Sequence, residues 1–168
     1  MSAGTLAAAP VDIGFAQDML DHHDQAIQIA TFAQVHATSP MVRSMAAAVI
    51  GSQRYEIGVL EQFLRDRGAG RGERDRTVMG WMGMPVPFDR MPGRQPDQAV
   101  VEFLNLDGPS VDQRFLELMI AHHEGGAHMA EYAGEHAENP DLRNLAKRMV
   151  VDQRTEIGDY QAALQALR

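Results

Sequence analysis

The sequence has 168 residues, of which 45% are apolar and 23% charged, and its formal net charge is −8. This length and composition are typical of one globular domain with a core large enough to fold without cross-links. The acidic balance disfavours a nucleic-acid surface, which needs clustered Lys and Arg, and favours cations as partners. No cysteine is present, which excludes disulfides, thiolate metal sites and cysteine nucleophiles.

The beginning of the chain and its hydropathy bear on targeting. No apolar run approaches the length of a membrane span, so we expect no span in this chain. The first residues, MSAGTLAAAP, lack the basic and long apolar regions of a secretory signal. We predict a flexible leader at residues 1–11 and a single domain at 12–168.

An internal repeat organises that domain. Residues 15–58 align without gaps on 115–158, at an offset of 100, with 16 identities in 44 positions. We interpret the domain as a duplicated unit, with repeat one at 12–66, a linker at 67–109 and repeat two at 110–168.

Each repeat is predicted to form two helices. In repeat one, Phe15, Met19 and Ala26 begin an apolar stripe with helical spacing, which continues to about His36. The pair Ser39-Pro40 then supplies an N-cap and a proline at the first helical position, and Asn139-Pro140 repeats this signal. Two such hairpins predict an all-α four-helix bundle. The linker is rich in Met, Gly and Pro, and only its residues 96–106 look briefly helical.

Polar residues occupy inward positions of these helices. At about 100° per residue, His22 and His23 flank the apolar stripe of the first helix, while Gln53 lies within the stripe of the second. Glu56 and Arg54 fall on the margins of that stripe, and repeat two carries the same set. Burying such groups without partners costs about 1–3 kcal/mol each, so the bundle must compensate them.

Two interpretations provide the compensation. In the first, the side chains form a structural hydrogen-bond network within an interaction bundle. The network residues other than histidine and glutamate are then Gln53, Arg54, Gln153 and Arg154. In the second, the imidazoles bind a metal ion, as side chains on facing helices do in bundle cores.

The spacing restricts the metal interpretation. Adjacent residues diverge on a helix, so His22 and His23 are not expected to bind one ion together. Met19 has chelating spacing with His23, as Met119 has with His123. His22 and His122 would then face Glu56, Glu156 or each other.

The ligand types favour copper. A thioether beside imidazole suits copper, above all Cu(I), whereas methionine offers nothing to zinc. Zinc, or no metal, remains the alternative. Iron oxidation by a ferritin-like oxidase ranks low, because the four inward carboxylates of a di-iron site are incomplete.

Accessory ligands are also present. His128 lies four residues after Glu124, which is chelating spacing. The linker segment MGWMGMPVPFDRM gathers four methionines around a tryptophan. They are Met79, Met82, Met84 and Met91. Methionines at this spacing can bind Cu(I), but they also fill gaps against aromatic rings, and we favour the structural interpretation.

Glycines recur at equivalent positions of the repeats. Gly58 and Gly158 lie in the second helix of each unit. We expect them to allow close helix approach, at some cost in helix propensity.

These motifs resemble the bacterial family called domain of unknown function 305. The resemblance rests on FAQDMLDHHDQAIQIA, GWMGMPVPFDRM and FLELMIAHHEGGAHMAEYA, followed by NPDLRNLAKRMVVDQRTEIGDY, and covers about residues 12–167. It implies a ferritin-like four-helix bundle, usually in exported or membrane-anchored proteins, some of which are linked to copper binding and copper resistance. No reaction is established for the family.

The family resemblance also defines a ligand set. Carried over by position, the metal residues are Met19, His22, His23, Glu56, Met119, His122, His123 and Glu156. We expect a metal-binding protein that sequesters or delivers copper, in an exported or cell-envelope location, and not an enzyme. The alternative is a non-catalytic structural or interaction bundle. An oligomer remains open in either case.

Overall fold

The computed structural model describes residues 10–167, which form helices and connecting loops. The long helices are α1 (Val11–His36), α2 (Pro40–Asp66), α4 (Pro109–His136) and α5 (Pro140–Ala166). The connecting segment, residues 67–108, holds the 3-10 turns η1 (Gly80–Met82) and η2 (Phe88–Arg90) and the short helix α3 (Asp97–Phe103). The predicted all-α fold with four long helices is confirmed, and α3 lies within the residues predicted to be briefly helical.

The predicted leader lies outside the described residues except for Pro10 and Val11. Pro10 precedes α1, and Val11 is already its first residue. Within residues 10–167, no helix has both the length and the apolar character that crossing a membrane requires.

Local sequence signals fix both hairpin turns. The Ser39 side chain accepts a hydrogen bond from the amide of Val42, and Asn139 accepts one from Leu142. Proline follows each cap at the first helical position, where its missing N–H costs nothing. As a result, α2 and α5 begin and end 100 residues apart.

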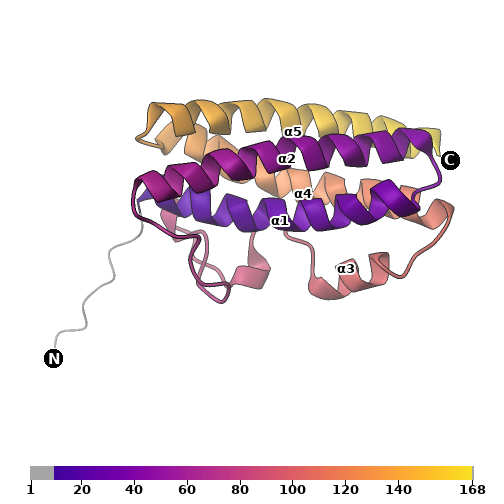
Figure 1. Ribbon diagram of the computed structural model, residues 1–168, viewed down its shortest axis with the longest axis horizontal. Coiled ribbons are helices and arrows are strands. Elements are labelled where there is room, and N and C mark those ends of the chain that lie inside the picture. Colours follow the sequence, from indigo (N-terminus) through magenta and orange to yellow (C-terminus); the bar gives the residue numbers. More distant parts are fainter. Residues whose placement is uncertain (1–9, 168) are drawn as a thin grey trace.

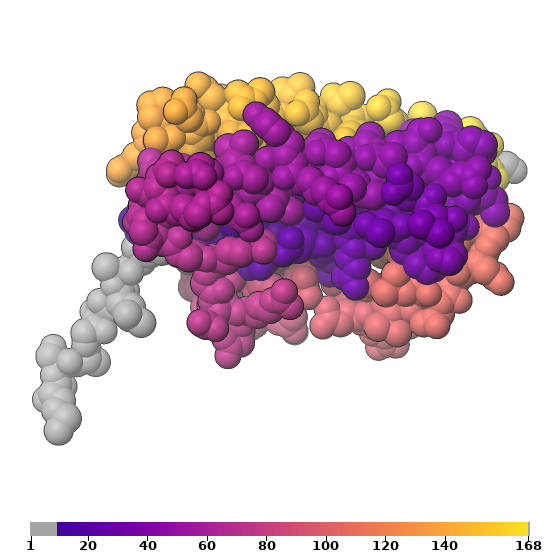
Figure 2. Space-filling model, viewed as in Figure 1, coloured from indigo at the N-terminus to yellow at the C-terminus, as the bar shows by residue number. Residues whose placement is uncertain are grey.

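The four long helices run side by side (Figure 1). α1 packs on α2, α4 packs on α5, and α1 and α4 pack on each other, whereas α2 and α5 have little backbone contact. The connecting segment lies along α1 and α4, on the side away from α2 and α5. In the space-filling view it forms a separate layer beneath α1 (Figure 2).

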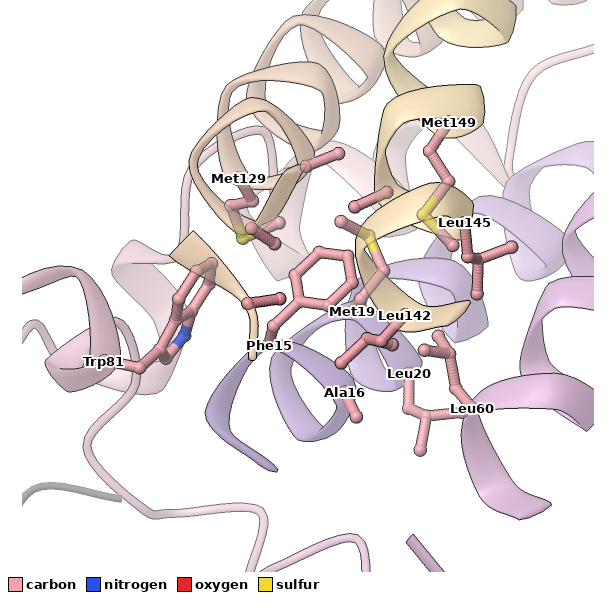
Figure 3. Packing of buried hydrophobic residues seen from close by; sticks show 14 of the residues in the cluster. Phe15, Ala16, Met19, Leu20, Leu60, Trp81, Met129, Leu142, Leu145 and Met149 are labelled. Atoms are coloured by element: carbon pink, nitrogen blue, oxygen red, sulfur yellow. The ribbon is translucent and has the colours of Figure 1, made fainter. Parts of the chain in front are cut away.

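The buried apolar residues form two clusters, one toward each end of the bundle. The first joins the start of α1 to the end of α2, the end of α4, the start of α5 and the connecting segment. In it, Phe15 and Met19 pack near Met129, Met149 and Trp81 (Figure 3). The second cluster joins the opposite ends of the same helices to α3.

Two buried aspartates tie each hairpin to the turn of the other. Asp112, in the first turn of α4, accepts hydrogen bonds from the amides of Thr38 and Ser39 at 3.2 and 2.9 Å. Asp12, in the first turn of α1, accepts from the amides of residues 138–139 at 2.8 and 2.9 Å. The carboxylates thus satisfy backbone groups that the turns leave free.

Replacing Asp112 with alanine leaves two amides without their acceptor. We expect Asp112→Ala to lower the free energy of unfolding by about 1–3 kcal/mol. Asp107→Ala removes an exposed carboxylate nearby and should change it by less than about 0.5 kcal/mol. Urea unfolding at constant m-value measures both. Equal losses in the two variants would contradict the role of Asp112.

Candidate metal centre

Four histidines of α1 and α4 form a polar layer between the two apolar clusters. His22 is 1% exposed, and His23, His122 and His123 are 0% exposed. The rings of His22 and His122 stack, with centroids 3.8 Å apart and planes inclined by 33°. The rings of His23 and His123 lie 6.3 and 6.2 Å from those of their chain neighbours. The inward placement predicted from the sequence is therefore present for all four.

The outer two histidines each pair with a glutamate of their own hairpin. His23 Nε2 lies 2.5 Å from Glu56 Oε2, and His123 Nε2 lies 2.6 Å from Glu156 Oε2. Because an ionised carboxylate can only accept, the imidazole Nε2–H donates in each pair. The glutamate side chains are 12% and 25% exposed, so each pair connects the buried layer with the surface.

The remaining ring nitrogens have no hydrogen-bond partner within residues 10–167. This holds for both nitrogens of His22 and of His122, and for Nδ1 of His23 and of His123. Buried polar atoms are nearly always paired in folded proteins, because each unpaired one costs on the order of 1–3 kcal/mol. This concentration of unpaired nitrogens is the feature of the layer that needs a functional explanation.

The central imidazoles are held neutral. Burial lowers the pKa of His22 well below its ordinary value, and neighbouring His23 and His123 lower it further. Burial likewise lowers the pKa of His122, followed by the effect of His22. A neutral imidazole carries a lone pair, so this pair of rings is in the protonation state that binds metals.

Glycines allow the close packing around the central rings. A Cβ on Gly126 would overlap Gln153 Oε1 and lie 2.8 Å from His22 Cε1. A Cβ on Gly125 would overlap the backbone of Gly93 in the connecting segment. Gly93 has a φ of +78°, and a Cβ there would lie 3.0 Å from His22 Nε2. The connecting segment therefore passes directly over the central pair.

Side chains of α1 fasten the connecting segment. Gln25 donates to the carbonyl of Gln95 at 2.9 Å and accepts from its amide at 2.7 Å. About two turns earlier on α1, Asp18 accepts from the Met79 amide and from Trp81 Nε1, both at 2.8 Å. Asp18 also pairs with Arg76 at 2.8 Å. The segment is thus fixed at two places along α1.

The structure distributes the other predicted residues more widely. Met19 lies in the first apolar cluster and Met119 in the second. Gln53 and Gln153 are buried, at 2% and 3% exposure. Arg54 and Arg154 are exposed, and Arg154 bonds Glu131 at 3.0 Å, so neither guanidinium belongs to a buried network.

The predicted accessory ligands are also dispersed. His128 is exposed. Met79 and Met91 are buried in the first apolar cluster, Met82 is half-buried against it, and Met84 is 50% exposed.

The centre is a pair of imidazoles rather than a closed cage. Within the described chain, no three His, Asp or Glu side chains are grouped so as to hold a metal ion. The lone pairs of imidazole lie in the ring plane, so the stacked His22 and His122 must turn to share an ion.

A family model described as Domain of unknown function (DUF305) matches residues 12–164. The chain belongs to this family. A DUF305 protein from Streptomyces coelicolor, whose name proposes that it is secreted, is 31% identical with a TM-score of 0.88, and the match covers 96% of each chain. A DUF305 fragment from Deinococcus radiodurans is 30% identical with a TM-score of 0.81, covering 95% of this chain and 98% of that one. No curated protein matches.

CopM in its Cu(II)-bound form has the same fold. It is 22% identical with a TM-score of 0.70, and the match covers 94% of this chain and 97% of that one.

Three residues of this DUF305 centre escaped the sequence analysis. Tyr160 lies edge-on to His123, with ring centroids 5.5 Å apart, and burial raises its pKa well above the ordinary value. Asp152 has a raised pKa, chiefly from burial and then from Glu56 and Glu156. Both residues lie four positions from Glu156, a spacing that could have identified them. Gly93 had no such signal, because the connecting segment is not repeated.

The lowered pKa values predict how stability depends on pH in the metal-free protein. Protons bind His22 and His122 more readily in the unfolded chain, whose histidines titrate near 6.5, than in the folded one. The free energy of unfolding should therefore fall as pH drops below about 6.5, by up to about 2.7 kcal/mol per pH unit for two groups. Urea unfolding in chelator between pH 5 and 7 measures the slope.

The control for this pH experiment is His22→Gln/His122→Gln, which keeps all carboxylates. Its profile should be flatter by the contribution of the two imidazoles. Parallel profiles for the variant and the original protein would contradict the assignment.

The glycine contacts are tested by the same substitution at two helical positions. Gly125→Ala should destabilise by about 1–3 kcal/mol, because its Cβ overlaps the connecting segment. Gly158 has nothing within 4 Å of a Cβ, so Gly158→Ala should stabilise by about 0.5–1 kcal/mol. Thermal unfolding measures both changes.

The open surroundings of Gly58 and Gly158 show that the predicted close helix approach there is wrong.

Proposed function

We propose that this DUF305 protein binds a metal ion as cargo, with copper the preferred ion, and that His22 and His122 are its central ligands. The observation that carries this proposal is the buried stacked pair, in which all four ring nitrogens are unpaired. Cu(I) accepts low coordination numbers, so two imidazoles that turn toward one ion suffice as its core ligands.

The flanking pairs support the same function. Because Nε2 of His23 and of His123 donates to a glutamate, each ring has its lone pair on Nδ1, which is buried and unpaired. A carboxylate that fixes the tautomer and orientation of a ligating histidine is the usual outer partner in metal sites. Glu56 and Glu156 are thus suited to orient two further ligands.

The ligand types favour copper among the possible ions. Imidazole suits copper and zinc, and copper heads the divalent affinity order at nitrogen sites. Met19 and Met119 lie three residues before the central histidines, and their thioethers would add a preference for Cu(I) if a local rearrangement brought them to the ion. Zinc is the second candidate ion.

A protein of the same fold supports a role in metal handling. CopM, which shares this fold, forms complexes with Cu(I), Cu(II) and Ag. The S. coelicolor relative is named as a candidate secreted protein. We propose sequestration or delivery of copper outside the cytoplasm, by a duplicated unit that contributes one histidine pair from each half, and no catalysed reaction.

A structural role is the second candidate function, and the short His–Glu pairs favour it. His23–Glu56 joins α1 to α2, and His123–Glu156 joins α4 to α5. In that case the histidines would hold the hairpins together without an ion.

Metal titration separates the two functions. Protein stripped by chelator is titrated with Cu(I), Cu(II) and Zn(II) in competition with a chromogenic chelator. We expect His22→Ala/His122→Ala to weaken Cu(I) binding by about 100-fold or more, because both central ligands are lost. His23→Ala/His123→Ala should weaken it by about 10–100-fold.

The matched control is His36→Ala/His136→Ala, which removes two exposed histidines from equivalent positions of the two hairpins. It should bind Cu(I) as the original protein does. Unchanged stoichiometry and affinity in the His22/His122 variant would refute the metal site. Loss of stability without any metal binding by the original protein would favour the structural function.

A further inference from the structure

The histidine layer has two sides that differ in packing and in charge. The helices α1 and α4, which carry the histidines, have the connecting segment on one side and α2 and α5 on the other (Figure 1). Since the central rings are at most 1% exposed, an ion must pass through one of these sides to reach them.

The connecting-segment side is closed by fixed contacts. The two hydrogen bonds between Gln25 and Gln95 hold the backbone against α1, and Gly93 lies against Gly125 of α4 without room for a methyl group. The side chain of Gln95 also donates to the carbonyl of Gly93 at 2.8 Å. An ion entering here would have to break these contacts together.

The charges on that side do not attract a cation. Asp21 pairs with Arg76 and Asp24 pairs with Arg71, each at 2.7 Å. A pocket of about 190 Å³ on this side is lined by both aspartates and by two further arginines, Arg74 and Arg94. Arg94 is near enough to His22 to contribute to its lowered pKa. The carboxylates here are neutralised by guanidinium groups.

The opposite side carries carboxylates with little cationic neutralisation. Glu56 of α2 and Glu156 of α5 reach the surface from their histidine partners, and Asp152 lies exposed one turn before Glu156 on the same face of α5. Both glutamates lie near enough to Asp152 to raise its pKa, after the larger effect of burial. Arg148 acts on this pKa in the opposite direction, with a smaller effect than either glutamate.

Two more arginines of these helices lie within two residues of Glu56 or Glu156. Arg154 is engaged with Glu131 on α4, and Arg54 is exposed on α2. α2 and α5 have little backbone contact with each other, so side chains rather than backbone fill the seam between them.

The glutamates also connect the surface with the central histidine pair. Glu56 contacts His23, whose ring centroid is 6.3 Å from that of His22, and Glu156 reaches His122 through His123 in the same way. Oxygen and nitrogen donors therefore follow one another from the surface to the central pair.

We propose that Asp152, Glu56 and Glu156 form the entrance through which a cation reaches His22 and His122, and that the connecting segment is the closed wall behind them. This inference rests on the proposed metal-binding function and adds a route to it. Within the described residues Asp152 forms no hydrogen bond or ion pair with a histidine, so its part is to attract the ion. It should change the rate of association more than the final affinity.

Stopped-flow mixing of the chelator-stripped full chain with Cu(I) supplied as a weak chelator complex tests the route. Asp152→Asn should slow association about two- to five-fold at low ionic strength, and the difference should vanish near 0.5 M salt as the charges are screened. Equilibrium affinity should change less than the rate.

Two further variants make the test specific to this position. Ser52 occupies on α2 the place that Asp152 has on α5, so Ser52→Asp should accelerate association. Glu135→Gln makes the same charge change as Asp152→Asn at an exposed site toward the end of α4, and should leave the rate within about 1.5-fold.

The opposite route is tested by Gln25→Ala, which frees the connecting segment from α1. The proposal expects no change in association rate for this variant. Faster association in Gln25→Ala, or an unchanged rate in Asp152→Asn while the original protein binds Cu(I), would overturn the entrance but leave the metal site standing. Failure of the original protein to bind Cu(I), or full binding by His22→Ala/His122→Ala, would overturn both.

Discussion

The constraint on which this structure depends is the burial of four imidazoles in one layer between two apolar clusters. Glutamates satisfy only one nitrogen of His23 and one of His123, and the stacked central rings receive no partner within residues 10–167. Apolar side chains in this layer would give a more stable fold, since an unpaired buried polar atom opposes folding. The neutral state of the central rings reduces this cost, because a buried charge would cost far more, and it leaves their lone pairs available.

The packing around this layer explains why glycine occupies several positions next to it. Gly126 makes room for His22 and Gln153, and Gly93 with Gly125 lets the connecting segment lie on α4. The pairing of the hairpins is fixed separately, at the bundle ends, by Asp12 and the equivalent Asp112. Stability is therefore supplied largely outside the layer, which leaves the histidine positions free for chemistry.

The sequence predicts the fold well because its signals are local. Ser39-Pro40 and the helical periodicity place the hairpin helices without reference to distant residues. The histidines were placed correctly for the same reason. Arg54 was misjudged because a position on the margin of a stripe can turn either way, and it turns outward. Gly93 and Gln25 could not be found, since their importance arises from contacts between segments about 30 or 70 residues apart, which no periodicity records.

The two hairpins agree where the layer needs identical groups and differ where its sides need different ones. Histidine, glutamine and glutamate recur at an offset of 100, so the central pair is nearly symmetric. Gln25, however, occupies the position in repeat one that Gly125 has in repeat two. Both contact the connecting segment, Gln25 by hydrogen bonds and Gly125 by close approach. Asp152 is equivalent to Ser52 in the other repeat, so the extra negative charge lies on α5 alone. A nearly symmetric pair of imidazoles within asymmetric surroundings gives the proposed site a direction: one face is covered by the connecting segment, and the other is negatively charged.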